Sequence, residues 1–146
     1  MQLSSSAFSN QGQIPSKYTC DAENVSPPLA VSDIPAGTQS LTLIVDDPDA
    51  PSGNWIHWLM WNISPSTTEI KESQVPTGAV QGVNDFGKNE YGGPCPPSGT
   101  HRYQFKLYAL NSTLDLSQDS QKKDLEAAIK DHIIGQDLLI GLYKRQ

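Results

Sequence analysis

The sequence predicts a mostly β fold with one or two peripheral helices. Segments with the two-residue periodicity of strands dominate the chain, a long Gly/Pro-rich stretch separates them, and helical spacing occurs only near the C-terminal end. The 146 residues correspond to a single domain, residues 1–146, and a hydrophobic content of 36% suffices for one buried core.

The clearest local signal is a β-hairpin. Residues 41–47 read Leu-Thr-Leu-Ile-Val-Asp-Asp and predict a strand, and residues 48–54 consist of turn-forming types. Residues 55–63 are rich in aromatic and β-branched residues and are too short for a typical helix, so they predict a second, largely buried strand. With strict alternation, one face of that strand would carry five residues: Trp55, His57, Leu59, Trp61 and Ile63.

Three further elements follow the hairpin. Residues 78–100 form a stretch without periodicity, and a loop of that length in a small domain usually has a function. Residues 101–110 alternate cleanly and predict a strand with His101 and Tyr103 on its apolar face. Helical spacing predicts a helix over 120–134 with a buried His132, followed by a closing strand over 137–143.

Charge and hydropathy exclude several classes of partner. Lys and Arg total 10 against 16 Asp and Glu, a net charge of −6, which argues against duplex nucleic acid and against an anionic membrane surface. No apolar run approaches the roughly 20 residues of a membrane span. The first residues lack the basic and apolar regions of a secretory signal, so we expect a cytoplasmic protein.

The two cysteines, Cys20 and Cys95, permit one disulfide. For a cytosolic chain we expect two reduced thiols instead, because disulfides are rare in that compartment. No C-x-x-C motif is present to indicate a redox centre or a zinc ribbon.

Polar side chains gather at the predicted strand ends. Asp47 and His57 lie at the closed end of the hairpin, and His101 and Tyr103 directly follow the Gly/Pro loop. Imidazoles can donate hydrogen bonds to an anion, as can backbone N–H groups in Gly-rich turns. Asp47 can orient a histidine tautomer or pair with a cationic group, and Trp55 can form a wall. These residues predict a small polar pocket.

The motifs of the chain resemble those of the phosphatidylethanolamine-binding protein family, in particular its bacterial and archaeal Raf-kinase-inhibitor-like branch. The resemblance rests on the ordered segments 47–51 (Asp-Pro-Asp-Ala-Pro), His57, 93–97 (Gly-Pro-Cys-Pro-Pro) and 101–103 (His-Arg-Tyr). It extends through segments 18–21, 24–28, 82–87 and 141–143 and covers residues 7–145. Each motif alone is weak, whereas their order and spacing together are specific.

The resemblance implies a large central β-sheet packed against a smaller sheet, and a surface pocket for small anions such as phosphate and for phosphorylated head groups. The matching ligand-binding positions are Asp47, Asp49, Pro51, Trp55, His57, Gly93, Pro96, His101 and Tyr103. His57 and His101 would donate to the anion, and Gly93 would let backbone approach it. A cis bond at the prolines of 48–51 is also implied. Unlike eukaryotic members, the sequence carries no additional C-terminal helix and has Ile56 where they tend to have a second histidine.

Several of these residues have simpler structural interpretations. Asp49 can cap its own turn, and Arg102, which faces away from His101, can form a structural salt bridge. The acidic pair Asp46 and Asp47 can be a solvated strand end.

Enzymatic alternatives have weaker support in the sequence. A hydrolase triad of Ser98, His101 and Asp47 lacks the Gly-x-Ser-x-Gly elbow, and Cys95 has no helix N-terminus to activate it as a partner of His101. A metal site from the Asp and His residues lacks a short-spaced ligand pair.

We therefore predict a non-catalytic protein, with no cofactor and no metal, that binds a small anion or a phosphorylated head group. The alternative function is inhibition of a partner protease or kinase through the pocket rim, which follows from the family resemblance alone. A homodimer is compatible with the sequence.

Overall fold

The computed structural model describes residues 1–146 and contains two β-sheets and one α-helix. The strands are β1 (Gln2–Ser4), β2 (Gly12–Gln13), β3 (Leu29–Ser32), β4 (Ser40–Asp47), β5 (Trp55–Ile63), β6 (Glu69–Ile70), β7 (Val80–Gln81), β8 (His101–Leu110) and β9 (Ile133–Tyr143). A 3₁₀ turn spans Ser16–Tyr18, and α1 spans Lys122–Ile129. The mostly β class and the strands at 41–47, 55–63 and 101–110 are confirmed.

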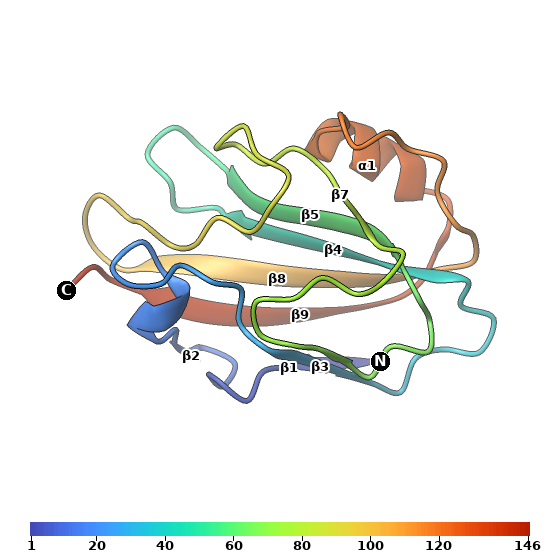
Figure 1. Cartoon of the computed structure of the whole chain (residues 1–146), viewed down its shortest axis with the longest axis horizontal. Coiled ribbons are helices and arrows are strands. Elements are labelled where there is room, and N and C mark those ends of the chain that lie inside the picture. Colours follow the sequence, from blue (N-terminus) through green and yellow to red (C-terminus); the bar gives the residue numbers. More distant parts are fainter.

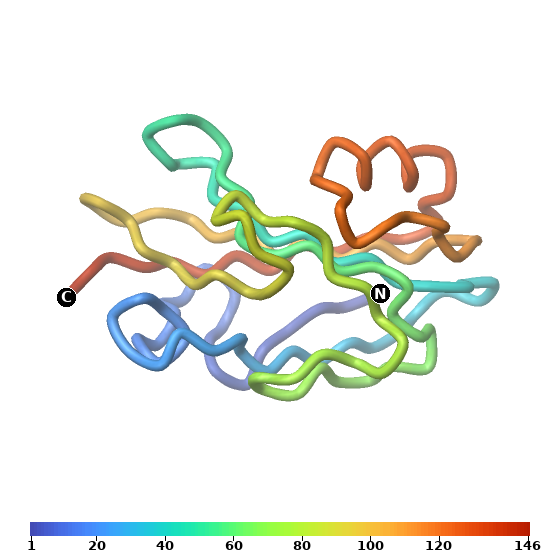
Figure 2. The backbone as a smooth tube through the Cα atoms, turned by 45° about the horizontal axis from the view of Figure 1, so that its top comes forward, coloured from blue at the N-terminus to red at the C-terminus, as the bar shows by residue number.

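The large sheet has the strand order β2-β9-β8-β4-β5-β7, and the small sheet has the order β1-β3-β6. All pairs in the large sheet are antiparallel except β2 with β9, so the sheet is mixed. Figure 2 shows the small sheet and α1 on opposite sides of the large sheet. The predicted packing of a large sheet against a smaller one is therefore confirmed.

Two apolar clusters hold these layers together. The larger has 20 buried residues and lies between the sheets, where Leu43 and Phe105 of the large sheet join Leu29 and Val31 of the small one. The smaller has 7 buried residues and joins α1 to the other face of the large sheet. All eight residues of β4 are buried because both faces of this central strand are covered.

Strand β5 departs from the predicted alternation. Leu59 and Trp61 pack toward α1, whereas Trp58 and Ile63 belong to the cluster between the sheets. The pairing with β4 shifts register twice, and one shift leaves His57 as an extra residue between the partners of consecutive β4 positions. The single face predicted for this strand is therefore wrong, because each bulge resets the side on which the following residues lie.

The helix is shorter than predicted. α1 begins after a capping box between Gln121 and Asp124 and ends at Ile129. His132 lies beyond it, partly exposed, with its Nδ1 2.9 Å from Asn111 Oδ1, so the predicted buried position on a helix face is wrong. The closing strand begins earlier than predicted, at Ile133. No helix has the length and apolar character required to cross a bilayer.

Candidate functional site: a pocket at the strand ends

The topology of the large sheet brings the predicted site residues together. Strand β4 runs antiparallel to both β5 and β8, so its C-terminal Asp47 lies beside the first residues of both neighbours. Trp55 is the register partner of Asp47, and His101 opens β8. Figure 1 shows the loops 48–54 and 92–100 at this same end of the sheet.

A cavity of about 290 Å³ opens at this end. Seven of the nine predicted ligand-binding residues line it, namely Asp47, Pro51, Trp55, His57, Pro96, His101 and Tyr103. The lining also contains Ala50, Ser52, Phe86, Cys95 and Pro97, and it includes neither Lys nor Arg. Apolar and proline surfaces thus surround a few convergent polar groups, which is typical of small-molecule sites.

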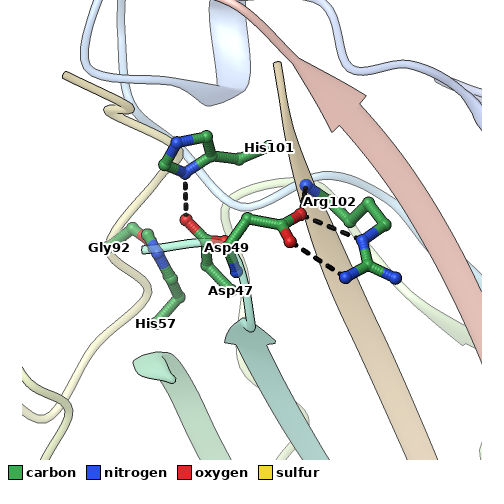
Figure 3. Close-up of polar contacts among 6 residues, drawn as sticks. All are labelled: Asp47, Asp49, His57, Gly92, His101 and Arg102. Atoms are coloured by element: carbon green, nitrogen blue, oxygen red, sulfur yellow. Dashed lines mark hydrogen bonds and ion pairs between the residues drawn. The ribbon is translucent and has the colours of Figure 1, made fainter. Parts of the chain in front are cut away.

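Asp47 fixes the orientation of His101. Its Oδ2 lies 2.7 Å from His101 Nδ1, and its Oδ1 accepts a 2.8 Å hydrogen bond from the backbone N–H of Asp49. Asp47 is 3% exposed and His101 7%. Figure 3 shows the hydrogen bond between the Asp47 carboxylate and the His101 ring. Because the carboxylate receives the Nδ1 proton, the Nε2 of His101 is the ring nitrogen left for a ligand.

His57 is held in a comparable way by backbone. Its Nδ1 lies 2.6 Å from the carbonyl oxygen of Gly92, and its own carbonyl accepts a hydrogen bond from the Gly92 N–H. The ring meets Phe86 and Tyr103 edge-on, with centroids 5.4 and 5.3 Å away. Burial lowers the pKa of the His57 imidazole, and the Gly92 carbonyl and nearby carboxylates offset only part of that shift.

Tyr103 brings a buried hydroxyl to the cavity. The residue is 1% exposed, and its hydroxyl has no hydrogen-bond partner within the protein. Burial, together with the charge of Asp47, raises the pKa of this phenol far above its usual value, so the hydroxyl keeps its proton. An unpaired buried hydroxyl costs free energy, and a ligand atom in the cavity would satisfy it.

Two predicted site residues do not line the cavity. Asp49 forms a two-pronged ion pair with the Arg102 side chain, with both contacts at 2.9 Å, and also accepts from the Arg102 backbone N–H. The structural salt bridge predicted for Arg102 is confirmed. The cap predicted for Asp49 is not seen, because its carboxylate contacts Arg102 and it is Asp47 that accepts from the Asp49 N–H. The pair lies on the side away from His57 in Figure 3. The pair holds the pKa of Asp49 down at about 2.

Gly93 contacts the chain instead of the cavity. Its N–H donates to Asn24 Oδ1 at 2.9 Å, and a Cβ at this position would collide with Asn24 and with the backbone of Tyr18 and Thr19. The glycine is therefore needed for packing, and it is not among the residues that line the cavity.

The expectation of two reduced thiols is also wrong, because Cys20 and Cys95 form a disulfide. It ties the Gly/Pro loop to the segment after the 3₁₀ turn, next to a hydrogen bond from the Cys20 N–H to the Pro94 carbonyl. Cys95 thereby becomes part of the cavity wall and is exposed at the surface. The two cysteines are 75 positions apart in the sequence, so no local motif indicated that they pair.

Phe86 is the other lining residue that matters chemically and that the sequence analysis missed. It is 43% exposed and stacks edge-on against both Trp55 and His57. The sequence signal that could have indicated its role is that Phe86 is the one aromatic residue in the stretch 82–87, which begins and ends with glycine.

Two other sequence interpretations are corrected at the same strand end. Asp46 and Asp47 are both buried, so they are not a solvated strand end. Asp46 pairs with Lys106 Nζ at 2.8 Å and accepts from Asn54 Nδ2. The peptide bonds of the 48–51 loop are all trans, contrary to the implied cis bond.

Neither nucleophile of the enzymatic alternatives is a free side chain of the cavity. Ser98 is exposed and does not line the cavity, and Cys95 is oxidised. No group of three or more His, Cys, Asp or Glu side chains is arranged to hold a metal ion.

The architecture is that of a two-sheet domain with a cavity at the strand ends. Residues 4–144 match the family model described as phosphatidylethanolamine-binding protein, and the chain belongs to this family.

Individual relatives agree with this assignment. The UPF0098 protein of Methanothermobacter thermautotrophicus is 51% identical over 99% of both chains. The structure is similar to that of CT736 of Chlamydia trachomatis, a phosphatidylethanolamine-binding protein homologue, with a TM-score of 0.96 and 43% identity over 99% of this chain and 97% of that one. It is also similar to YbcL of E. coli, described as a member of the mammalian family, with a TM-score of 0.93 and 32% identity over 99% and 98%.

Proposed function

We propose that the protein is a non-catalytic binding protein that holds a small anion or a phosphorylated head group in the cavity at the strand ends. The observation that carries the proposal is the convergence of three buried polar side chains, His57, His101 and Tyr103, on one cavity. Each imidazole has one nitrogen committed to the protein and one left over, and the Tyr103 hydroxyl has no partner.

The size of the cavity favours a small ligand. A volume of about 290 Å³ is at the lower end of the range of small-molecule sites, which suits an inorganic anion or a head group. The apolar walls formed by Trp55, Phe86 and the prolines reduce the contact of a bound anion with water, so each hydrogen bond to it would be stronger than at an open surface.

The absence of catalysis is part of the proposal. Ser98 lies outside the cavity, and Cys95 has no thiol while it is in the disulfide, so neither is available as an activated nucleophile. Esterase turnover that disappears in Ser98→Ala would contradict this part. The alternative of a protease or kinase inhibitor rests on the family resemblance, and no feature of the structure favours it.

The proposed site can be tested by NMR titration with inorganic phosphate and with phosphoethanolamine. We expect the ring resonances of His57 and His101 to shift together with one binding curve. His132, which contacts Asn111 away from the cavity, is the internal control and should not move. A response confined to His132 would show that the site is wrong.

The cytoplasmic location is likewise a proposal, and the disulfide is the observation that speaks against it. Thiol alkylation in intact cells tests it. A chain that is fully protected from alkylation would indicate an oxidising compartment or a disulfide that resists the cytosolic reductants.

A further inference from the structure

The cavity proposed to hold an anion contains no permanent positive charge. Neither Lys nor Arg lines it, whereas the Asp47 carboxylate does. The nearest arginine, Arg102, is already paired with Asp49. The only lining groups that can become cationic are therefore the imidazoles of His57 and His101.

Both imidazoles have their Nδ1 proton committed to the protein. A carbonyl oxygen only accepts hydrogen bonds, so the 2.6 Å contact with Gly92 assigns a proton to His57 Nδ1. The Asp47 carboxylate, whose other oxygen accepts from the Asp49 N–H, assigns a proton to His101 Nδ1 in the same way. In a neutral imidazole the remaining Nε2 then carries a lone pair and is an acceptor.

This hydrogen-bond pattern is unsuited to a fully ionised oxyanion. The oxygens of such a dianion are all acceptors, and they would face the acceptor Nε2 atoms of His57 and His101 next to the Asp47 charge. Among the buried side chains that line the cavity, only Tyr103 has a hydroxyl that can donate a hydrogen bond whatever the protonation state of the histidines. One added proton, carried by the ligand or by a ring, converts a repulsive contact into a hydrogen bond.

We infer that the cavity takes up an oxyanion together with a proton, so that its ligand class is a protonated oxyacid such as a phosphate monoester in its monoanionic form. This inference rests on the proposed function and specifies the ionic form of the ligand. It also makes Gly92 and Asp47 positioning residues, because their oxygens decide which nitrogen of each ring faces a ligand.

The charged groups around the two rings are consistent with the uptake of a proton together with the anion. His57 faces the carboxylates of Asp46 and Asp47 from β4 and of Asp85 from the loop 82–92, together with the phenol of Tyr103. Burial nevertheless outweighs these carboxylates and keeps the pKa of His57 below its ordinary value, so the ring is neutral at pH 7 without a ligand.

His101 has a different set of neighbours. It faces Asp47 from β4, stacks on Tyr103, and pairs across the sheet with Tyr143 of β9. The charge of Asp49, which lies nearby, is compensated by its ion pair with Arg102. An anion in the cavity would therefore be the added charge that favours a proton on the ligand or on the His57 ring.

Isothermal titration calorimetry with methyl phosphate tests the inference, because this probe has no ammonium group that could itself donate to Nε2. Near pH 7.5 a phosphate monoester is mostly a dianion, since its second pKa is about 6. Repeating the titration in buffers of different ionisation enthalpy should give an uptake of about one proton per bound ligand. The Kd should rise by up to about tenfold per pH unit above neutrality.

His57→Gln is the informative variant, because an amide can donate at every pH. We expect its proton uptake to be smaller and its Kd to vary less between pH 6 and 8 than in the natural protein, because only His101 then presents an acceptor Nε2. The matched control is His132→Gln, which alters a histidine outside the cavity and should keep the full uptake. If His57→Gln does not fold, the proton count of the natural protein decides the question.

The outcomes separate this inference from the proposed function. Binding of methyl phosphate with no proton uptake and a constant Kd from pH 6 to 8.5 would overturn the inference and leave the proposed function intact. Tighter binding of ethylammonium than of methyl phosphate at pH 7.5 would overturn it in favour of a cation site. If neither cavity ring responds to methyl phosphate even at pH 5.5, the proposed function itself fails.

Discussion

The Asp47 carboxylate and the His101 imidazole, 54 residues apart in the chain, form a 2.7 Å hydrogen bond in the cavity wall, where both side chains are almost completely buried. The contact joins the end of β4 to the start of β8. It therefore contributes to the stability of the sheet end as well as to the site.

Asp47→Ala should destabilise the protein by about 2–4 kcal/mol, because it leaves two buried donors, His101 Nδ1 and the Asp49 N–H, without an acceptor. Urea unfolding at pH 7 measures the change. Asp47→Asn keeps an acceptor oxygen and should lose less. The exposed Asp131 provides the control, and Asp47→Ala as stable as Asp131→Ala would contradict the prediction.

Removing the disulfide should also lower stability. The bond between Cys20 and Cys95 closes a loop with a sequence separation of 75, so its loss should cost about 2–5 kcal/mol. We expect the double variant Cys20→Ser/Cys95→Ser to unfold at lower urea concentration than the oxidised protein. Reductant should shift the natural protein toward the variant and leave the variant itself unchanged; an unaltered midpoint in both would refute the assignment.

The ion pair of Asp49 with Arg102 predicts a defined acid dependence. The pKa of Asp49 in the folded protein is lowered to about 2, so the unfolded chain binds the proton more readily. The stabilisation is present above pH 4 and is lost as the pH falls toward 2. The two side chains are 30% and 51% exposed, so solvent screening limits the effect to about 1 kcal/mol.

Asp49→Asn measures this contribution. The variant should be less stable than the natural protein at pH 6 and nearly equal to it below pH 2, as followed by urea unfolding at each pH. Added salt at pH 6 should narrow the difference. A deficit of the same size at both pH values would mean that the charge of Asp49 is not its cause.

Gly93→Ala should destabilise the chain by about 1–3 kcal/mol, because its Cβ would meet the backbone of Tyr18 and Thr19 beside the disulfide. Gly92→Ala is the matched comparison. The three atoms nearest to its Cβ would all belong to the ring of Phe86, which is partly exposed and can turn away. Thermal unfolding should place Gly93→Ala below Gly92→Ala, and the reverse order would show that the loop adapts at Gly93.

Sequence patterns predicted those parts of the fold in which one local signal dominates. Strand β8 alternates from His101 to Ala109, so the burial of His101 and Tyr103 followed directly from its period. Strand β5 did not follow its pattern, because the register shifts opposite β4 depend on tertiary pairing. Positive φ at Asn62 accompanies one of these irregularities, and Asn adopts this conformation more readily than most residues, but an Asn within a run of strand-forming residues does not by itself locate a bulge.

The same distinction applies to the site. His57 and Trp55 could be assigned because they flank a recognisable turn, and antiparallel pairing brings the turn to the start of β8. Cys95 and Phe86 could not be assigned, because each reaches the cavity from a long irregular loop whose path is set by distant contacts. The packing of Gly93 against Asn24 and the backbone of Tyr18 and Thr19 had no local signal for the same reason.

The disulfide also divides the chain into a covalent ring and two tails. The ring from Cys20 to Cys95 contains His57, whereas β8 and β9 lie outside it, with His101 just beyond its edge. A protease cut in the largely exposed stretch 71–78 would leave both fragments joined by the disulfide, whereas a cut in the exposed residues 97–100 would leave the strand that carries His101 with no covalent link to the rest. Of the two imidazoles in the cavity, His57 thus lies within the covalent ring closed by the disulfide, whereas His101 depends on the single chain connection after Cys95.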